Sequence, residues 1–348
     1  MEILSNNKNK ILVIQTAFPG DAVLSLPMIR KLKEMNGESI IDVLCTPITK
    51  DIFQLAPYIN EIIVIDKKGE HRSLRSFYNF TRMLRKRGYD KIYSPHRSFR
   101  TAFTVLLSGT RETYGFSNSS LFHVYKYLTE YKIDHHEVQR GFDLIGYNYT
   151  TDGWKILPEI TVPPETEIKI SNYLKESIDD SAFAVIAPGS IWATKKYPME
   201  QFKVIIKYLI SLGLKIIIIG GKDEEKTGDL LASEYGENLV STAGKFTFAE
   251  SIALLKHAQI LISNDSAPAH LGLIANIPVL TLYCSTIPEF GFYPYNEKSR
   301  WLSVSDLDCK PCGIHGYNKC PLKHFLCGYK LDTGMVISTI KEILNVKN

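Results

Sequence analysis

The sequence predicts an α/β protein with two domains, each built around a parallel β-sheet. Three observations predict this class: strand and helix patterns alternate, the alternation occurs twice, and the chain has 348 residues. That length corresponds to about two domains of about 150 residues each. Alternating β and α units imply a parallel sheet that helices cover on both faces.

The predicted elements follow one another in the same order in each half. In the first half we expect strands at 11–15, 40–44, 61–66 and 91–93, and helices at about 21–35, 73–87 and 99–107. In the second half we expect strands at 183–187, 215–219, 260–263 and 279–283, and helices at about 199–212, 224–235, 248–256 and 268–275. Each half therefore resembles a Rossmann-like domain.

A proline-rich interruption at 157–165 separates the two halves. We expect an N-terminal domain over 1–163 and a C-terminal domain over 164–332, with their sheets facing a central cleft. Residues 333–348 contain an amphipathic helix pattern. The sequence leaves open whether that helix packs back on the first domain.

Composition excludes several classes of protein. No apolar run approaches the roughly 20 residues that span a bilayer, and the polar stretch 1–10 lacks the apolar core of a secretory signal. We therefore expect a cytoplasmic protein. The net charge of +4 is too mild to predict nucleic-acid binding. Basic residues are nevertheless crowded in the first half, where they could face phosphates or an anionic membrane: Arg75, Arg82, Arg85, Lys86, Arg87, Arg97 and Arg100.

The most informative stretch runs from Ser263 to Leu271, where a predicted buried strand is followed by a short apolar helix. Asp265 and Ser266 occupy helix-capping positions, whose side-chain oxygens accept backbone N–H groups. The start of such a helix favours a bound phosphate, and His270 lies one turn further along. Open α/β sheets bind nucleotides at turns of this kind. The alternative is an ordinary capped helix with a surface histidine.

Two other predicted strands are followed by polar groups. The Pro-Gly turn at 18–21 ends in Asp21, which suits a general base at the ligand-binding edge of the sheet or a plain helix cap. Residues 188–198 place Ser190, Thr194 and Lys195 in the loop after strand 183–187. A lysine there suits a diphosphate, and a solvated basic loop is the alternative.

Acidic residues, including Asp223, follow the strand at 215–219. A carboxylate at this position can accept hydrogen bonds from ribose hydroxyls, or it can belong to an acidic first turn of a helix. No Gly-x-Gly-x-x-Gly follows any predicted strand and no P-loop sequence occurs. These absences argue against a dehydrogenase and against a P-loop nucleotidase.

Four cysteines, Cys309, Cys312, Cys320 and Cys327, lie close together near the C-terminus. In a cytoplasmic protein such spacing favours metal over disulfides, although it is irregular for a zinc ribbon. Zinc, disulfides and reduced thiols all remain open. We expect a structural cluster, because it lies far along the chain from Asp21 and Lys195.

Taken together, the motifs resemble glycosyltransferase family 9, the lipopolysaccharide heptosyltransferases. They occur in family order over nearly the whole chain. The matching elements are Gly20-Asp21 with Leu26-Pro27, His96-Arg97-Ser98-x-Arg100-Thr101-Ala102, His136-Glu137-Val138-x-Arg140, Pro188-Gly189-Ser190 with Lys195-x-Tyr197-Pro198, Ala243-Gly244-Lys245, the stretch from Ser263 to Leu271, and the cysteine cluster.

The resemblance implies a GT-B fold and inverting transfer of a heptose from ADP-heptose, with no metal and no cofactor besides the ADP-sugar. It implies a phosphorylated lipid A–core acceptor and no nucleic-acid partner. Asp21 matches the general base, and Arg97, Arg100 and Arg140 would hold the acceptor. Peripheral contact with the cytoplasmic face of the inner membrane is left open.

For the donor, Lys195 matches the lysine on the diphosphate, with Ser190 and Thr194 beside it. The nucleotide-binding loop is matched by Asp265, Ser266, Ala267 and His270, where Ala267 replaces the usual glycine. Asp223 is a looser match to the ribose contact, because the loop can be aligned one residue either way.

Two other functions fit the same plan. A nucleotide-sugar epimerase or hydrolase would consume the donor without an acceptor, and a non-catalytic module would bind a glycan or lipid. Asp21, Lys195 and His270 together argue for retained chemistry.

Overall fold

The computed structural model describes residues 9–346. The chain divides into two compact units, the first ending at Thr161 and the second beginning at Val162. Most of the polar N-terminal stretch, for which no secretory signal is expected, lies outside the described residues, as do positions 347–348 of the predicted C-terminal segment. Among the described residues, no helix is long and apolar enough to cross a membrane.

The first unit is built on a parallel sheet, six-stranded within the described residues, in the order β3-β2-β1-β4-β5-β6. Its strands are β1 (Lys10–Ile14), β2 (Ile40–Cys45), β3 (Glu61–Val64), β4 (Lys91–Ser94), β5 (Glu112–Phe116) and β6 (Tyr127–Thr129). Its helices are α1 (Pro19–Asn36), α2 (Lys50–Gln54), α3 (Leu74–Lys86), α4 (Phe99–Ser108) and α5 (Glu137–Ile145).

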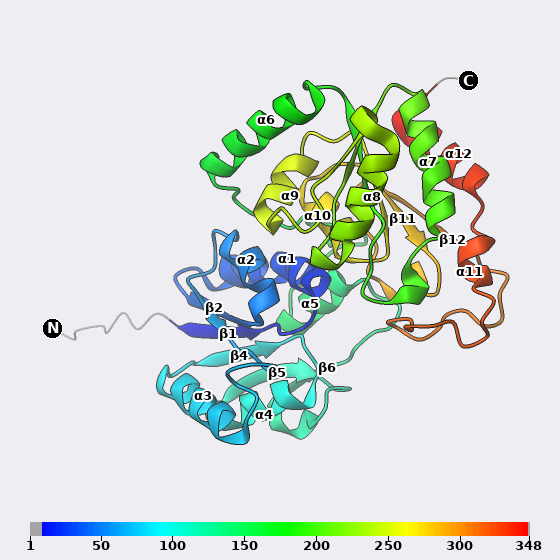
Figure 1. Ribbon diagram of the computed structural model, residues 1–348. Helices are drawn as coiled ribbons and strands as arrows, with labels where there is room; N and C mark the ends of the chain where they lie inside the picture. The colour runs from blue at the N-terminus through cyan, green and yellow to red at the C-terminus, as the bar shows by residue number, and fades with distance from the viewer. Residues whose placement is uncertain (1–8, 347–348) are drawn as a thin grey trace. The chain divides into compact units, whose positions relative to one another are not determined.

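Helices cover both faces of this sheet (Figure 1). The helices α3 and α4 pack on one face, where their apolar side chains join a buried cluster with β1, β3 and β4. The helix α1 contacts both α2 and α5 on the other face. The four residues Ile11 to Ile14 of β1 are completely buried, as expected for a central strand of a parallel sheet.

The second unit repeats this plan with a six-stranded parallel sheet among its described residues, in the order β12-β11-β10-β7-β8-β9. Its strands are β7 (Phe183–Ala187), β8 (Lys215–Ile218), β9 (Leu239–Ser241), β10 (Leu261–Asn264), β11 (Val279–Tyr283) and β12 (Arg300–Ser303). Its helices are α6 (Pro164–Ile178), α7 (Met199–Ser211), α8 (Glu225–Tyr235), α9 (Phe248–Leu255), α10 (Ala267–Ile274), α11 (Leu326–Tyr329) and α12 (Thr333–Leu344).

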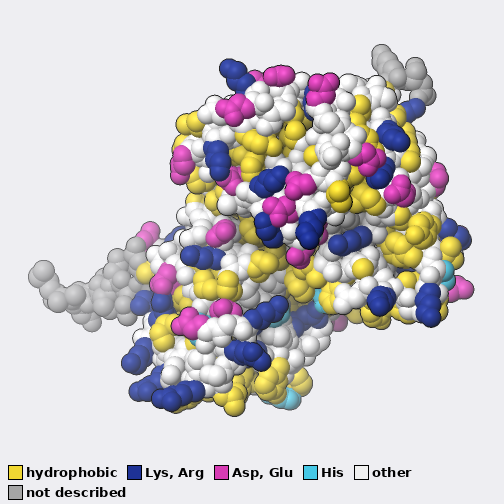
Figure 2. All heavy atoms as spheres, in the orientation of Figure 1, with side chains coloured by type: hydrophobic (Ala, Val, Ile, Leu, Met, Phe, Trp, Pro, Cys, Tyr) yellow, Lys and Arg dark blue, Asp and Glu magenta, His cyan; other side chains and the backbone are white. Residues whose placement is uncertain are grey.

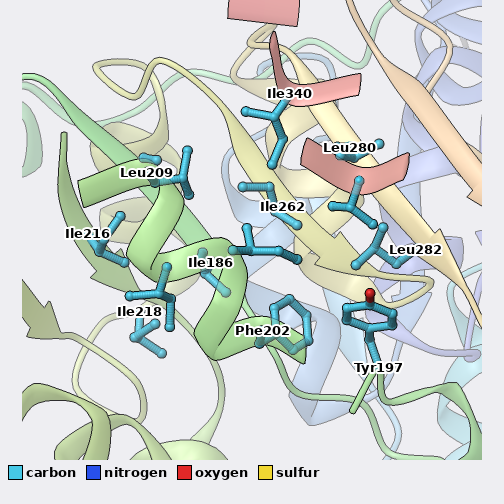
Figure 3. Packing of buried hydrophobic residues seen from close by; sticks show 14 of the residues in the cluster. Ile186, Tyr197, Phe202, Leu209, Ile216, Ile218, Ile262, Leu280, Leu282 and Ile340 are labelled. Carbon is cyan, nitrogen blue, oxygen red and sulfur yellow. The ribbon is translucent and has the colours of Figure 1, made fainter. Parts of the chain in front are cut away.

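The core of the second unit lies between its sheet and the helices α7, α8 and α12. Figure 3 shows isoleucine and leucine side chains of the strands packing against Phe202 and Leu209 of α7 and Ile340 of α12. The C-terminal helix thus buries its apolar side chains in the second unit. Two parallel α/β units confirm the predicted fold class.

Candidate functional site

In the second unit, polar residues gather where the sheet reverses its strand order. From β7, the sheet continues through β8 and β9 on one side and through β10 to β12 on the other. Open α/β sheets bind ligands beyond the carboxyl ends of the strands at such a reversal. The loop after β7 supplies Gly189 and Lys195, and the turn after β10 supplies Asp265 and Ser266.

Asn264, the last residue of β10, forms hydrogen bonds that link the turn after β10 to the loop after β7. Its side chain is fully buried, and its Nδ2 donates to the carbonyl oxygen of Pro188 at 2.8 Å. Its Oδ1 accepts from the backbone N–H of Tyr197 at 2.9 Å. The hydroxyl of Ser266 donates to the carbonyl of Gly189 at 3.3 Å. Both ends of the 188–197 loop are therefore fixed to the turn after β10.

Lys195 and Asp265 form an ion pair among these polar residues of the second unit. Lys195 Nζ lies 2.5 Å from Asp265 Oδ2, and the two side chains are only 14% and 11% exposed. The hydroxyl of Thr286, which follows β11, donates to the same carboxylate oxygen at 2.7 Å. The pair holds an ammonium group in place before any ligand binds, in partly desolvated surroundings where charges interact strongly.

His270 lies inside α10 and is buried, not on the surface as its alternative interpretation requires. Among the described residues, its Nδ1 has no hydrogen-bond partner. Burial lowers the pKa of His270 to about 4; Lys195 lowers this pKa further and Asp265 opposes the shift. At neutral pH the imidazole is therefore uncharged and keeps an unused polar atom beside the ion pair.

The carboxylate that faces the loop after β7 belongs to Glu224, and Asp223 is exposed. Glu224 Oε2 accepts from the N–H of Gly221 at 3.1 Å, and its Oε1 lies 3.8 Å from Lys196 Nζ. A Cβ on Gly189 would stand 2.5 Å from the Glu224 carboxyl carbon, so the Glu224 side chain would have to shift if Gly189 carried a side chain. The sequence leaves open which acidic residue after Gly221 contacts the ribose, and Glu224 is the one that faces the loop after β7.

The cysteine segment lies against the same site, contrary to what its position in the sequence suggests. The N–H of Cys312 donates to the carbonyl of Ser285 at 2.8 Å. The N–H of Tyr317 donates to Thr194 Oγ1 at 2.8 Å, and the N–H of Thr194 donates back to the Tyr317 carbonyl at 3.0 Å. Residues 312–317 therefore support the loop that carries Lys195.

The cysteines themselves are all unpaired thiols. Within the described part of the chain, no three His, Cys, Asp or Glu side chains are grouped so that they could hold a metal ion. Cys327 is buried in the core of the second unit together with Cys284. Burial raises the pKa of the Cys327 thiol to about 11, which keeps it protonated and unreactive.

In the first unit, the strand order reverses between β1 and β4, and a polar cluster lies there. Lys67 Nζ donates to Thr16 Oγ1 at 2.6 Å, and Thr16 Oγ1 lies 2.8 Å from His96 Nδ1. His96 Nδ1 is also 2.8 Å from Thr101 Oγ1. Burial and the nearby Arg100 lower the pKa of Lys67 to about 8, and burial and Lys67 lower that of His96 to about 4.

Asp21 lies in the first turn of α1, next to the β1 end of this reversal. Its Oδ2 accepts from the N–H of Phe18 at 3.2 Å, so the carboxylate caps its own helix. Arg100 donates to the carbonyl of Lys67 at 3.1 Å. The guanidinium of Arg97 lies 3.8 Å from the centroid of the Tyr131 ring. The first unit thus combines the Asp21 carboxylate with several cations at a sheet edge.

Arg140, which is expected to bind an acceptor, is buried, and its role in acceptor binding stays a prediction. It is 1% exposed, and it donates to the carbonyls of Lys132 at 2.8 Å and Ile133 at 2.6 Å. Its NH1 also pairs with Glu137 at 3.0 Å. These contacts join the guanidinium to the loop before α5. A sequence motif does not show whether a side chain is buried. The sequence therefore could not distinguish the buried Arg140 from Arg97 and Arg100.

Lys67 was missed by sequence analysis, although a signal was available. It follows β3 by three residues, and the carboxyl ends of parallel strands meet at one sheet edge. Examination of every strand end, rather than of recognised motifs alone, would have included it.

Comparison with known proteins agrees with this geometry. The family model for glycosyltransferase family 9 (heptosyltransferase) matches residues 77–320. The chain is 26% identical to lipopolysaccharide heptosyltransferase 3 of Escherichia coli, covering 77% of this chain and 82% of that protein. It is 23% identical to lipopolysaccharide heptosyltransferase 2 of E. coli K12, covering 89% and 90%.

The fold agrees as well. The structure of E. coli ADP-heptose LPS heptosyltransferase II superimposes with a TM-score of 0.78 at 20% identity, covering 97% of this chain and 98% of that one. This likeness identifies the fold of the two units as GT-B. Because the family model matches well over half of this chain, the chain belongs to glycosyltransferase family 9, the heptosyltransferases.

Proposed function

We propose that this protein transfers a heptose from ADP-heptose to a lipopolysaccharide inner-core acceptor, with inversion and without a metal. The observation that carries the proposal is the ion pair of Lys195 and Asp265 at the strand reversal of the second unit. Its support is the family membership and the relatives named as lipopolysaccharide heptosyltransferases.

In this proposal the second unit binds the donor. Lys195 meets the diphosphate, and Asp265 holds the lysine in place from the other side. The diphosphate also faces the start of α10, where Ser266 and Ala267 present backbone N–H groups. Ser190 and Thr194 lie in the same loop as Lys195. These donors offset the charge that develops on the leaving group, a role that needs no metal ion.

We assign the ribose contact to Glu224 rather than Asp223. The Glu224 carboxylate faces Gly189 and Gly221, whereas Asp223 is exposed. His270 supplies a neutral polar atom beside the same turn. The adenosine would thus lie near the carboxyl ends of β7, β8 and β10.

The first unit would bind the acceptor. Asp21 takes a proton from the attacking hydroxyl, and the sugar passes through an oxocarbenium-like transition state. Lys67, Arg97 and Arg100 give the cations that a phosphorylated acceptor needs. We place the reaction in the cytoplasm, where both the nucleotide sugar and the growing core would be available.

The test is mass spectrometry of the products formed from ADP-heptose and core-oligosaccharide acceptors, with ADP release measured in parallel. A transferase adds one heptose mass and releases ADP only when acceptor is present. ADP release without acceptor would favour an epimerase or hydrolase, and no turnover would favour a binding module. Full activity in EDTA is expected; strict dependence on magnesium or manganese would refute the metal-independent mechanism.

A further inference from the structure

One surface of the first unit combines exposed apolar and basic side chains, and none of the functions proposed above uses it. We call it the α3–α4 surface. Its apolar members are Leu74 and Tyr78 of α3 and Phe99, Phe103 and Leu106 of α4. Its basic members are Arg75, Arg82 and Lys86 of α3. The two helices pack against each other, and Figure 2 shows basic and hydrophobic side chains gathered over this end of the unit.

The helix α4 is apolar on both sides. Ala102 and Val105 are buried against the sheet. On the outer side Phe99, Phe103 and Leu106 are 61%, 36% and 52% exposed. Their spacing of four and three residues places them on one stripe of the helix. A surface helix normally presents polar side chains on its outer side, so an apolar outer stripe points to something that covers it.

This apolar stripe has a fixed shape. The rings of Phe99 and Phe103 stack with centroids 6.1 Å apart, and Phe103 stacks on the buried Phe77 of α3 at 6.2 Å. Leu74, at the start of α3, is 89% exposed. The apolar groups are therefore presented outward by packed helices.

The charge around the stripe is mostly positive. Between residues 71 and 111 the chain has ten Lys or Arg and a single acidic residue, whereas the whole chain has 41 and 37. A shallow pocket on α3 is lined by Asn79, Arg82, Met83, Lys86 and Arg87. Arg87 is held by Glu61, while Arg82 and Lys86 are exposed to solvent.

We propose that the α3–α4 surface docks on an anionic lipid bilayer. The stripe of α4 enters the boundary between headgroups and acyl chains, and the cations of α3 meet lipid phosphates. Apolar residues beside Lys and Arg, with no acid among them, are the pattern of interfacial membrane helices.

The use of this surface rests on the proposed function, since a lipid-anchored acceptor would be reached from the bilayer. Binding itself can be measured without donor or acceptor. A failure of membrane docking and a failure of heptose transfer are therefore distinguishable.

The experiment is co-sedimentation with vesicles of phosphatidylcholine alone and with 30% phosphatidylglycerol. The full chain should bind the anionic vesicles at least about tenfold more tightly, and added salt should weaken the binding. Phe99→Ser/Leu106→Ser and Arg82→Gln/Lys86→Gln should each lose about tenfold or more in affinity. The matched control is Lys226→Gln/Leu230→Ser on α8 of the second unit, where Leu230 is 72% exposed; it should bind like the parent.

Insertion has its own measurement. A Phe99→Trp variant should be quenched by lipids brominated in their acyl chains, and a Leu230→Trp variant should not. Unchanged melting temperatures, and unchanged turnover on a soluble acceptor, would show that the variants remain folded. Equal binding of parent and surface variants, equal binding to neutral vesicles, or no vesicle binding would overturn the proposal. If the parent protein were a dimer and the Phe99→Ser/Leu106→Ser variant a monomer, the surface would be a protein interface instead.

Discussion

Asp21 has two roles that a substitution can separate, because it caps α1 and is the proposed base. Asp21→Asn keeps an oxygen that can accept from Phe18 but cannot remove a proton at neutral pH. We expect turnover to fall about 10²–10⁴-fold, with ADP affinity and melting temperature almost unchanged. Turnover within a few-fold of the parent at saturating acceptor would show that another group is the base.

Lys195 and Lys196 are adjacent but differently placed. Lys195 is largely buried against Asp265, whereas Lys196 is about half exposed and lies 3.8 Å from Glu224. Lys195→Ala should weaken ADP binding by about 1.5–3 kcal/mol, as for a hydrogen bond to a charged group. Lys196→Ala is the matched control and should have a smaller effect. Calorimetric titration with ADP checks both, and the opposite ranking would move the role to Lys196.

Burial of His270 makes stability depend on pH. Its pKa is about 4 in the folded chain, against about 6.5 when unfolded. Below pH 6.5 the unfolded chain binds a proton that the folded chain does not. Stability present at neutral pH is therefore lost as the pH falls towards 4, by up to about 1.4 kcal/mol per pH unit.

Urea unfolding at pH 7 and pH 5 measures this loss. The variant His270→Gln should lose less stability between the two values than the parent does. His96, in the first unit, also has its pKa lowered to about 4, so part of the loss should remain. An equal loss in parent and variant would contradict the assignment to His270.

At the scale of residues, sequence identified groups at strand ends but not their burial or exact partner. The motifs contained Lys195, Asp265 and His270, which the structure brings together. Glu224 and Asp223 could not be ranked, because the packing of Gly189 decides between them. Arg140 could not be separated from Arg97, because a motif does not show that backbone carbonyls surround the guanidinium of Arg140.

Among the elements, the segment 309–327 makes contacts that a pair of glycines can test. Gly316 and Gly313 both have positive φ, 78° and 70°. A Cβ on Gly316 would lie 2.9 Å from Ser285 Oγ and Thr194 Oγ1, whereas on Gly313 the nearest atom is 4.0 Å away. Both alanine variants strain the backbone by a similar amount, and only Gly316→Ala pushes on the Lys195 loop.

We therefore expect Gly316→Ala to lower ADP affinity several-fold more than Gly313→Ala, at comparable losses of melting temperature. Fluorescence or calorimetric titration with ADP would measure this. If the two variants bound ADP alike, the segment would stabilise the unit without positioning the loop.

Prediction of elements was most complete for the central strands, which are almost wholly buried. The predicted strands correspond to β1 to β4, β7, β8, β10 and β11. Sequence missed β5, β6, β9 and β12, which lie towards the sheet margins; β6 and β9 have three residues each. Such strands form because a neighbouring strand pairs with them, and little local signal exists. The helix α6 was hidden by the proline pair 163–164, of which Pro164 starts it.

For the whole molecule, each unit has its own buried core, and the proposed donor residues all belong to the second. A ligand present at 100 times its Kd stabilises the state that binds it by about 2.7 kcal/mol. ADP should therefore raise the calorimetric transition of the second unit and leave the other unchanged. Leu12→Ala removes a buried side chain from β1 and should lower the transition temperature of the first unit, which identifies the transition of that unit. A single transition that moves as a whole would show that the units unfold together.

The margins of the two sheets have a consequence for the behaviour of the protein at high concentration. The outermost strands among the described residues are short: β3 and β12 have four residues, and β6 and β9 have three. A sheet edge recruits other chains through its unpaired N–H and C=O groups, and a longer, flatter edge recruits them better. Within the described residues the two open sheets have four such edges. Each edge offers a neighbouring chain at most four residues to pair with. Short edge strands therefore limit aggregation through the margins of both sheets.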